Sequence, residues 1–144
     1  MAGVKGVNSL KSVKGTPRRQ ETEHPLAVAV FAAEAGNGEL RSVAIQEGIE
    51  ARYFSGHEEW MASVRKGECY MVLVDVTTFG LDGTAVVERL KGDSRTRKIP
   101  VVAFGDSLRA DLLQDALEAG ADLVLPRSAL RKQWKGILRR FRAG

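Results

Sequence analysis

Tyr70-Met71-Val72-Leu73-Val74-Asp75-Val76-Thr77-Thr78-Phe79-Gly80-Leu81-Asp82-Gly83 is the segment that decides the fold of this 144-residue chain. Its apolar residues run without interruption into Asp75, and a short polar loop follows. A continuous apolar run of this length is typical of a strand that is buried on both faces, as in a parallel sheet. Open α/β sheets hold their ligands at the carboxyl ends of their strands, so Asp75 lies where a functional site is expected.

The rest of the chain alternates between strand and helix patterns. Apolar runs predict further strands at residues 26–31, 49–54, 99–104 and 123–125. Apolar residues at helical spacing predict helices at residues 39–47, 60–66, 84–92, 108–120 and 129–141. We expect Ser107 and Ser128 to cap the last two helices, and the charged residues within 49–54 place that strand at an edge. The alternation predicts an α/β fold with a five-stranded, doubly wound parallel sheet.

Length and composition bound the class of protein. The single cysteine, Cys69, precedes the central strand and is interpreted as a core residue. No apolar run approaches the ~20 residues of a membrane span, and lysines interrupt the few apolar residues of the N-terminus, so no signal-peptide core is present. We expect a cytoplasmic protein with a flexible basic tail at residues 1–24 and one domain at residues 25–144.

Charge is unevenly distributed along the chain. The net charge is +4, yet residues 1–25 carry five Lys or Arg against two Glu, and residues 128–144 carry six Lys or Arg and no acid. The body between these ends therefore has a net charge of −5. An acidic body with two basic ends indicates an anionic partner for the ends, or serves solubility alone.

Several motifs together resemble the receiver domain of response regulators, the phospho-accepting half of two-component signalling. They are the segment from Asp75 to Gly83, Leu90-Lys91, Thr96-Arg97 followed by Ile99-Pro100-Val101-Val102, and Ala119-Gly120-Ala121-Asp122. The resemblance covers about residues 25–141 and implies a flavodoxin-like, CheY-like (βα)5 fold. Phe79 replaces the proline that the family usually has in the loop after the aspartate.

The resemblance also implies a phosphorylation site, but most of the residues that the family uses there are replaced in this chain. In the family, two acids after the first strand hold Mg²⁺, an aspartate accepts the phosphoryl group, a Ser or Thr after the fourth strand binds that group, and a lysine after the fifth neutralises charge. Asp75 is the phosphoacceptor-equivalent, whereas Gly105 and Arg127 stand at the hydroxyl and lysine positions. The first strand ends in Ala32-Ala33, and Glu34 is the nearest carboxylate.

The missing acids weigh most against phosphorylation. Mg²⁺ binds proteins through one or two carboxylates together with phosphate oxygens. Without that ion, an anionic donor approaches an anionic aspartate. Two unit charges ~4 Å apart at an effective dielectric of ~20 repel by about 4 kcal/mol, or roughly three orders of magnitude in rate. We therefore interpret Asp75 as an inactive residue paired with Arg127, which joins the ends of the third and fifth strands.

These observations favour a stand-alone atypical receiver, or pseudo-receiver. It would be a non-enzymatic protein-interaction module of signal transduction that works without phosphorylation, cofactor or metal. The first alternative is a phospho-accepting single-domain response regulator that uses Asp75, Glu34, Arg127 and Mg²⁺. The second is a nucleotide or nucleic-acid binder that uses the basic last helix and tail, although the tail has no aromatic residue and the chain no nucleic-acid motif.

The expected partner is a signalling protein with an acidic surface, and the chain is expected to be a monomer or weak homodimer that binds no membrane. In the family, partners bind the face made by the fourth helix, the fifth strand and the fifth helix. The residues expected there from the last helix are Arg131, Trp134, Lys135, Leu138 and Arg139. Cations that have no acid on their own helix repel one another modestly, which suggests that a partner supplies the acid.

Overall fold

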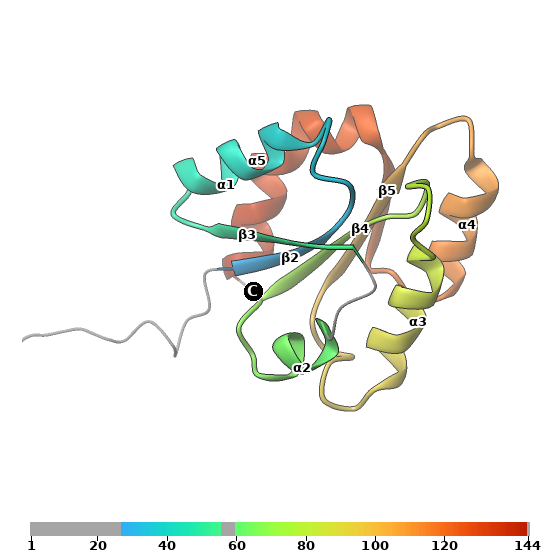
Figure 1. Ribbon diagram of the computed structural model, residues 1–144, viewed down its shortest axis with the longest axis horizontal. Coiled ribbons are helices and arrows are strands. Elements are labelled where there is room, and N and C mark those ends of the chain that lie inside the picture. Colours follow the sequence, from blue (N-terminus) through green and yellow to red (C-terminus); the bar gives the residue numbers. More distant parts are fainter. Residues whose placement is uncertain (1–26, 56–59, 144) are drawn as a thin grey trace, which may run out of the picture.

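The computed structural model describes residues 27–55 and 60–143, so the predicted tail lies outside the described residues. Within them, strands and helices alternate along the chain (Figure 1). The elements are β2 (Ala27–Phe31), α1 (Gly38–Gln46), β3 (Glu50–Phe54), α2 (Trp60–Arg65), β4 (Met71–Asp75), α3 (Gly83–Gly92), β5 (Val101–Gly105), α4 (Ala110–Glu118), β6 (Leu123–Pro126) and α5 (Arg127–Ala143). All the predicted strands and helices are confirmed, with ends that shift by up to two residues.

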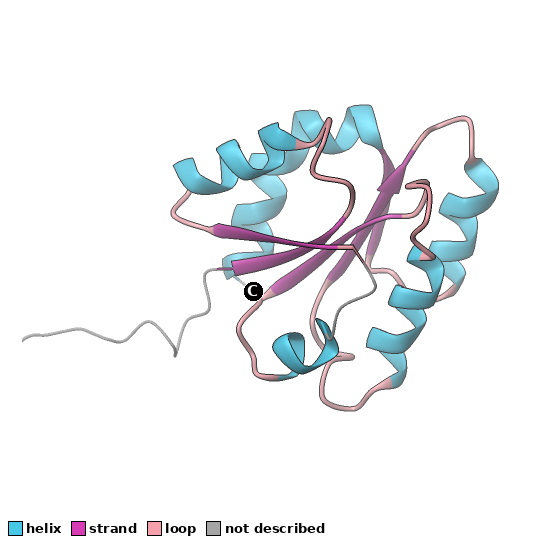
Figure 2. Cartoon of the chain, viewed as in Figure 1, coloured by secondary structure: helices cyan, strands magenta, loops and turns pink. Residues whose placement is uncertain are grey.

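The five strands form one parallel sheet in the order β3-β2-β4-β5-β6. The edge position predicted for residues 49–54 is confirmed, because β3 pairs only with β2 among the described strands. Helices α1 and α5 cover one face of the sheet, and α2, α3 and α4 cover the other (Figures 1 and 2). This is the predicted doubly wound α/β fold.

Alternate residues of each strand build two separate cores, because successive side chains of a strand point to opposite faces. On one face, Val72 and Val74 of β4 pack with Val87 of α3 and with the other apolar residues of that layer. On the other face, Leu73 of β4 packs with Trp134 of α5. Strand β4 is buried along its whole length, as its continuous apolar run predicts.

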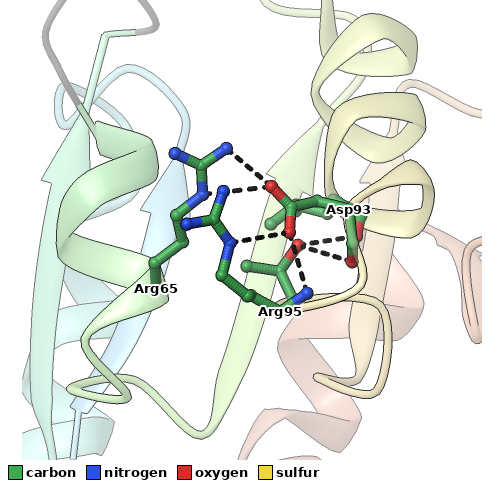
Figure 3. Close-up of polar contacts among 5 residues, drawn as sticks. Arg65, Asp93 and Arg95 are labelled. Atoms are coloured by element: carbon green, nitrogen blue, oxygen red, sulfur yellow. Dashed lines mark hydrogen bonds and ion pairs between the residues drawn. The ribbon is translucent and has the colours of Figure 1, made fainter.

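A charged cluster surrounds Asp93, which follows α3 in the loop before β5 (Figure 3). Arg65 of α2 donates from Nε and Nη2 to Asp93 Oδ2 at 3.0 and 2.6 Å, and the Arg95 backbone N–H donates to Oδ1 at 2.8 Å. The Arg95 N–H and the Arg65 guanidinium lower the pKa of Asp93 to about 2. The cluster ties α2 to the loop before β5, at the end of the sheet away from Asp75.

Two predicted helix caps are wrong. Helix α4 begins at Ala110, and no side chain caps it. Asp106 forms a turn instead, because its carboxylate accepts from the Leu108 N–H at 2.9 Å and its carbonyl from the Arg109 N–H. Helix α5 begins at Arg127, directly after Pro126 ends β6, so Ser128 lies inside the helix and cannot cap it.

Candidate functional site

Asp75 lies at the carboxyl end of β4 with its side chain 1% exposed. Its Oδ1 accepts from the backbone N–H and the hydroxyl of Thr77, both at 2.9 Å. Its Oδ2 accepts from Arg127 Nη2 at 2.5 Å. Both carboxylate oxygens are therefore occupied by groups of the chain itself.

Thr77 fills the space beside Gly105. Gly105 is the position at which the resemblance places the Ser or Thr that binds the phosphoryl group. A Cβ on Gly105 would lie 2.6 Å from Thr77 Cγ2 and 3.0 Å from its Oγ1, which is closer than a real Cβ contact. The Thr77 hydroxyl also accepts from the Asp106 N–H at 3.2 Å. One hydroxyl from the loop after β4 thus bridges Asp75 and the loop after β5.

Arg127 closes the site from the side of β6. Its guanidinium lies 5.4 Å from the centre of the Phe104 ring and donates to Asp75. The register pairs Asp75 with Phe104, and Gly105 with Pro126, so the ends of β4, β5 and β6 lie side by side. The predicted pair of Asp75 with Arg127 is confirmed, and it joins the ends of β4 and β6.

The end of β2 does not supply a metal site. Ala32 and Ala33 follow the strand, and the carboxylate of Glu34 pairs with Arg41 at 2.7 Å in an exposed position. Within the described residues, no three His, Cys, Asp or Glu side chains gather as a metal site would need. The remaining carboxylate, Asp75, has both oxygens engaged. The carboxylates of Glu34 and Asp75 therefore do not form the Mg²⁺ site of a receiver.

The loop from β4 to α3 has the predicted end at Asp82-Gly83. The Asp82 carboxylate caps α3 by accepting from the Ala85 N–H at 3.1 Å. Gly83 is needed for close packing, because a Cβ there would lie 2.9 Å from Val76 Cα. The loop also holds Phe79 out into solvent with an exposed fraction of 102%.

Two residues of the expected interaction face lie in the core. Trp134 and Leu138 are 1% and 0% exposed, so they offer no surface to a partner. The indole Nε1 of Trp134 donates to the Leu40 carbonyl at 2.9 Å and helps to dock α5 on α1. Both belong to the apolar stripe that packs α5 on the sheet.

The remaining three residues of that face, Arg131, Lys135 and Arg139, already meet acids of α1 and its C-terminal cap. Arg131 pairs with Glu39 at 2.9 Å. Arg139 donates to both oxygens of Glu47, at 2.8 and 3.2 Å, and Lys135 lies 4.0 Å from the same carboxylate. The hydrogen bond from Arg139 lowers the pKa of Glu47. The chain itself therefore supplies acids that the sequence suggested would come from a partner.

Sequence reasoning missed Thr77 as a residue of the site. Its signal is the spacing Asp75-x-Thr77, since a Thr two residues after an Asp can donate both its N–H and its hydroxyl to that carboxylate. The second signal is the glycine at position 105, which leaves the neighbouring loop room for a side chain.

Comparison with solved structures finds receiver domains of response regulators and histidine kinases. A putative response regulator from Chloroflexus aurantiacus has 22% sequence identity and a TM-score of 0.66, with 81% of this chain and 99% of that chain covered. The receiver domain of a sensor histidine kinase from Pseudomonas aeruginosa, with magnesium in its active site cleft, has 15% identity and a TM-score of 0.70, with 83% and 99% covered. The chemotaxis response regulator CheY4 of Vibrio cholerae has 16% identity and a TM-score of 0.65, with 80% and 96% covered.

These likenesses show that the chain has the receiver fold, as the sequence predicted. No protein-family model matches the chain, and no curated protein matches it. None of the helices in the described part of the chain is both long and apolar enough to cross a membrane.

Proposed function

We propose that the protein is an atypical receiver, or pseudo-receiver, that acts in cytoplasmic signal transduction as a non-enzymatic, phosphorylation-independent protein-interaction module. The receiver fold supports the signalling role. The independence from phosphorylation is inferred from Asp75, whose carboxylate oxygens accept hydrogen bonds from Thr77 and Arg127.

A phosphoryl group on Asp75 would need one of these oxygens as its nucleophile. Attack through Oδ1 would compete with the bonds from Thr77, and attack through Oδ2 would weaken the ion pair with Arg127. A buried carboxylate that loses such partners is costly, because hydrogen bonds to charged groups contribute about 1.5–3 kcal/mol each. This cost adds to the part of the repulsion between the donor and Asp75 that the Arg127 cation does not offset.

The phospho-accepting alternative would need a metal ligand beside Asp75. Glu34 is the carboxylate nearest to the end of β2, but it is exposed and pairs with Arg41. The nucleic-acid alternative would need unpaired cations on α5. Glu39 and Glu47 pair with Arg131 and Arg139 and lower the net positive charge of α5, which weakens the case for a role that depends on a long run of phosphates.

Amide NMR in the presence of beryllium fluoride and Mg²⁺ tests the proposal, since the reagent mimics a phosphoryl group on aspartate. Gly105 stands at the position where the resemblance to receivers places the hydroxyl that binds the phosphoryl group, so no coupled two-state element is expected. The expected result is a spectrum that does not change in wild type or in Asp75→Asn. Shifts that spread from Asp75 to α5 in wild type, and are absent in Asp75→Asn, would favour the phospho-accepting alternative.

A further inference from the structure

Phe79 is the most exposed large apolar side chain among the described residues. It lies in a tight turn in which the Leu81 N–H donates to the Thr78 carbonyl at 3.3 Å and Gly80 has a φ of 83°. The glycine permits this φ, and the turn holds the ring away from the sheet. Single exposed apolar residues are common, so the surface on each side of the ring decides whether Phe79 has a role.

An apolar hollow of about 420 Å³ lies on one side of Phe79. Ala32, Phe54 and Leu81 line it, and they come from the ends of β2, of β3 and from the loop after β4. Among the described residues that line it, Glu34 alone is charged, and it already pairs with Arg41. The alanines that replace the acids of a receiver thus leave an apolar surface at the switch point of the sheet.

A basic hollow of about 360 Å³ lies on the other side of Phe79 and shares Ala33, Thr78 and Phe79 with the first. Arg127 and Arg131 line it, with side chains 32% and 44% exposed. Asp75 also lines this hollow, but it is almost fully buried. The solvent-facing charges of the residues that line this hollow are therefore the two guanidinium groups, although the exposed carboxylate of Glu39, which does not line it, pairs with Arg131.

Both arginines keep hydrogen-bond donors for a ligand. A guanidinium has five N–H donors. Arg127 uses Nη2 for Asp75, and Arg131 uses Nε for Glu39 and Nη2 for the Gly36 carbonyl. An incoming carboxylate can accept from the remaining N–H groups without breaking these contacts.

We infer that these two hollows, together called the Phe79 trough, bind an acidic segment of a partner protein, with an apolar side chain in the apolar hollow and a neighbouring carboxylate on Arg127 and Arg131. The inference rests on the proposed function as a protein-interaction module and gives it a binding surface that takes Arg127 and Arg131 from the start of α5. The arginines line one hollow and Glu34 lines the other, so the carboxylate of the segment is expected at the arginine end. A protruding aromatic ring between open hollows is typical of an interface anchor.

Selection of a phage-displayed library of random peptides on the wild-type chain tests the trough. The expected result is enrichment of peptides in which Leu, Ile, Phe or Trp lies beside Asp or Glu. In fluorescence polarisation with an enriched peptide, Phe79→Ser and Arg131→Gln should each weaken binding by about tenfold or more. Added salt should weaken binding to wild type as well.

Ile45→Ser and Lys132→Gln are the matched controls, because Ile45 is an exposed apolar residue of α1 and Lys132 an exposed cation of α5, both outside the trough. Neither should change binding, and circular dichroism should show that all four variants fold. Peptides without acids, or equal loss in the controls, would overturn the inference. A dimer in sedimentation velocity that Phe79→Ser abolishes would also overturn it, in favour of a second copy as the occupant. Each of these failures leaves the phosphorylation-independent function standing, since that is tested at Asp75.

Discussion

Thr77 occupies the space that a side chain at position 105 would need, so substitutions at these two positions are expected to be coupled. Gly105→Ser should lower the free energy of unfolding by about 1–3 kcal/mol, because its Cβ overlaps Thr77 Cγ2. In the Thr77→Ala background the same substitution should cost less, with a coupling of about 1 kcal/mol. Urea unfolding of the two single variants and the double variant measures this coupling.

Gly136→Ala is the control for that cycle. A Cβ at this position of α5 would meet no atom within 4 Å, so alanine should stabilise the helix by about 0.5–1 kcal/mol. Strictly additive effects of the changes at positions 77 and 105 would show that Thr77 does not fill this space.

The bonds of Asp75 predict a graded response to substitution. Asp75→Asn keeps an oxygen that can accept from Thr77, and the partly exposed Arg127 can turn to water, so the cost should be about 1 kcal/mol. Asp75→Ala leaves the Thr77 N–H and hydroxyl without this partner and should cost about 2–4 kcal/mol. Urea unfolding near neutral pH compares the two variants, and equal costs would argue against the observed bonds.

The lowered pKa of Asp93 predicts that the protein loses stability in acid. Its pKa lies near 2 in the folded protein, below the ordinary value of 3.8, so its charged form stabilises the fold. That contribution is complete above about pH 4 and is lost as the pH falls through the folded value. Urea unfolding between pH 6 and pH 2 should therefore show a shallower acid loss in Asp93→Asn than in wild type. Asp115→Asn, on the exposed side of α4, is the control and should follow wild type.

The ion pairs between α5 and Glu47 predict that charge reversal on α5 destabilises the protein. The reversals Arg131→Glu, Lys135→Glu and Arg139→Glu together place acids opposite Glu39 and Glu47, and should lower the melting temperature. The swap of Arg139→Glu with Glu47→Arg restores opposite charges and should recover part of the loss seen in Arg139→Glu alone. Thermal unfolding at low salt measures this, and no recovery would mean that the pair contributes nothing.

The sequence was sufficient to predict strands and helices, whose patterns are local. It was also sufficient for residue pairs at the ends of neighbouring parallel strands, because the sheet brings these ends together. The apolar run before Asp75 predicts a buried strand, and the ends of neighbouring parallel strands bring Asp75 and Arg127 together. The contact of Thr77 with Gly105 could not be predicted in the same way, because it depends on how the loop after β4 turns back over β5.

Two other features also depend on geometry that spacing does not reveal. The pairs of Arg139 with Glu47 and of Arg131 with Glu39 join residues about 90 positions apart, and they depend on the rotation of α5 against α1. The start of α4 depends on Asp106, whose side chain bonds to the Leu108 N–H and delays the helix past Ser107. A short polar side chain competes with the backbone in this way wherever both fit.

The most direct test of the central claim is the intact mass of the protein after incubation with acetyl phosphate and Mg²⁺, beside a conventional receiver as the positive control. Because Asp75 is engaged by Thr77 and Arg127, and Ala32 and Ala33 stand where a receiver has its acids, the account predicts that the chain keeps its unmodified mass while the control gains a phosphoryl group. A robust phosphoryl adduct on this chain that disappears in Asp75→Asn would contradict the account.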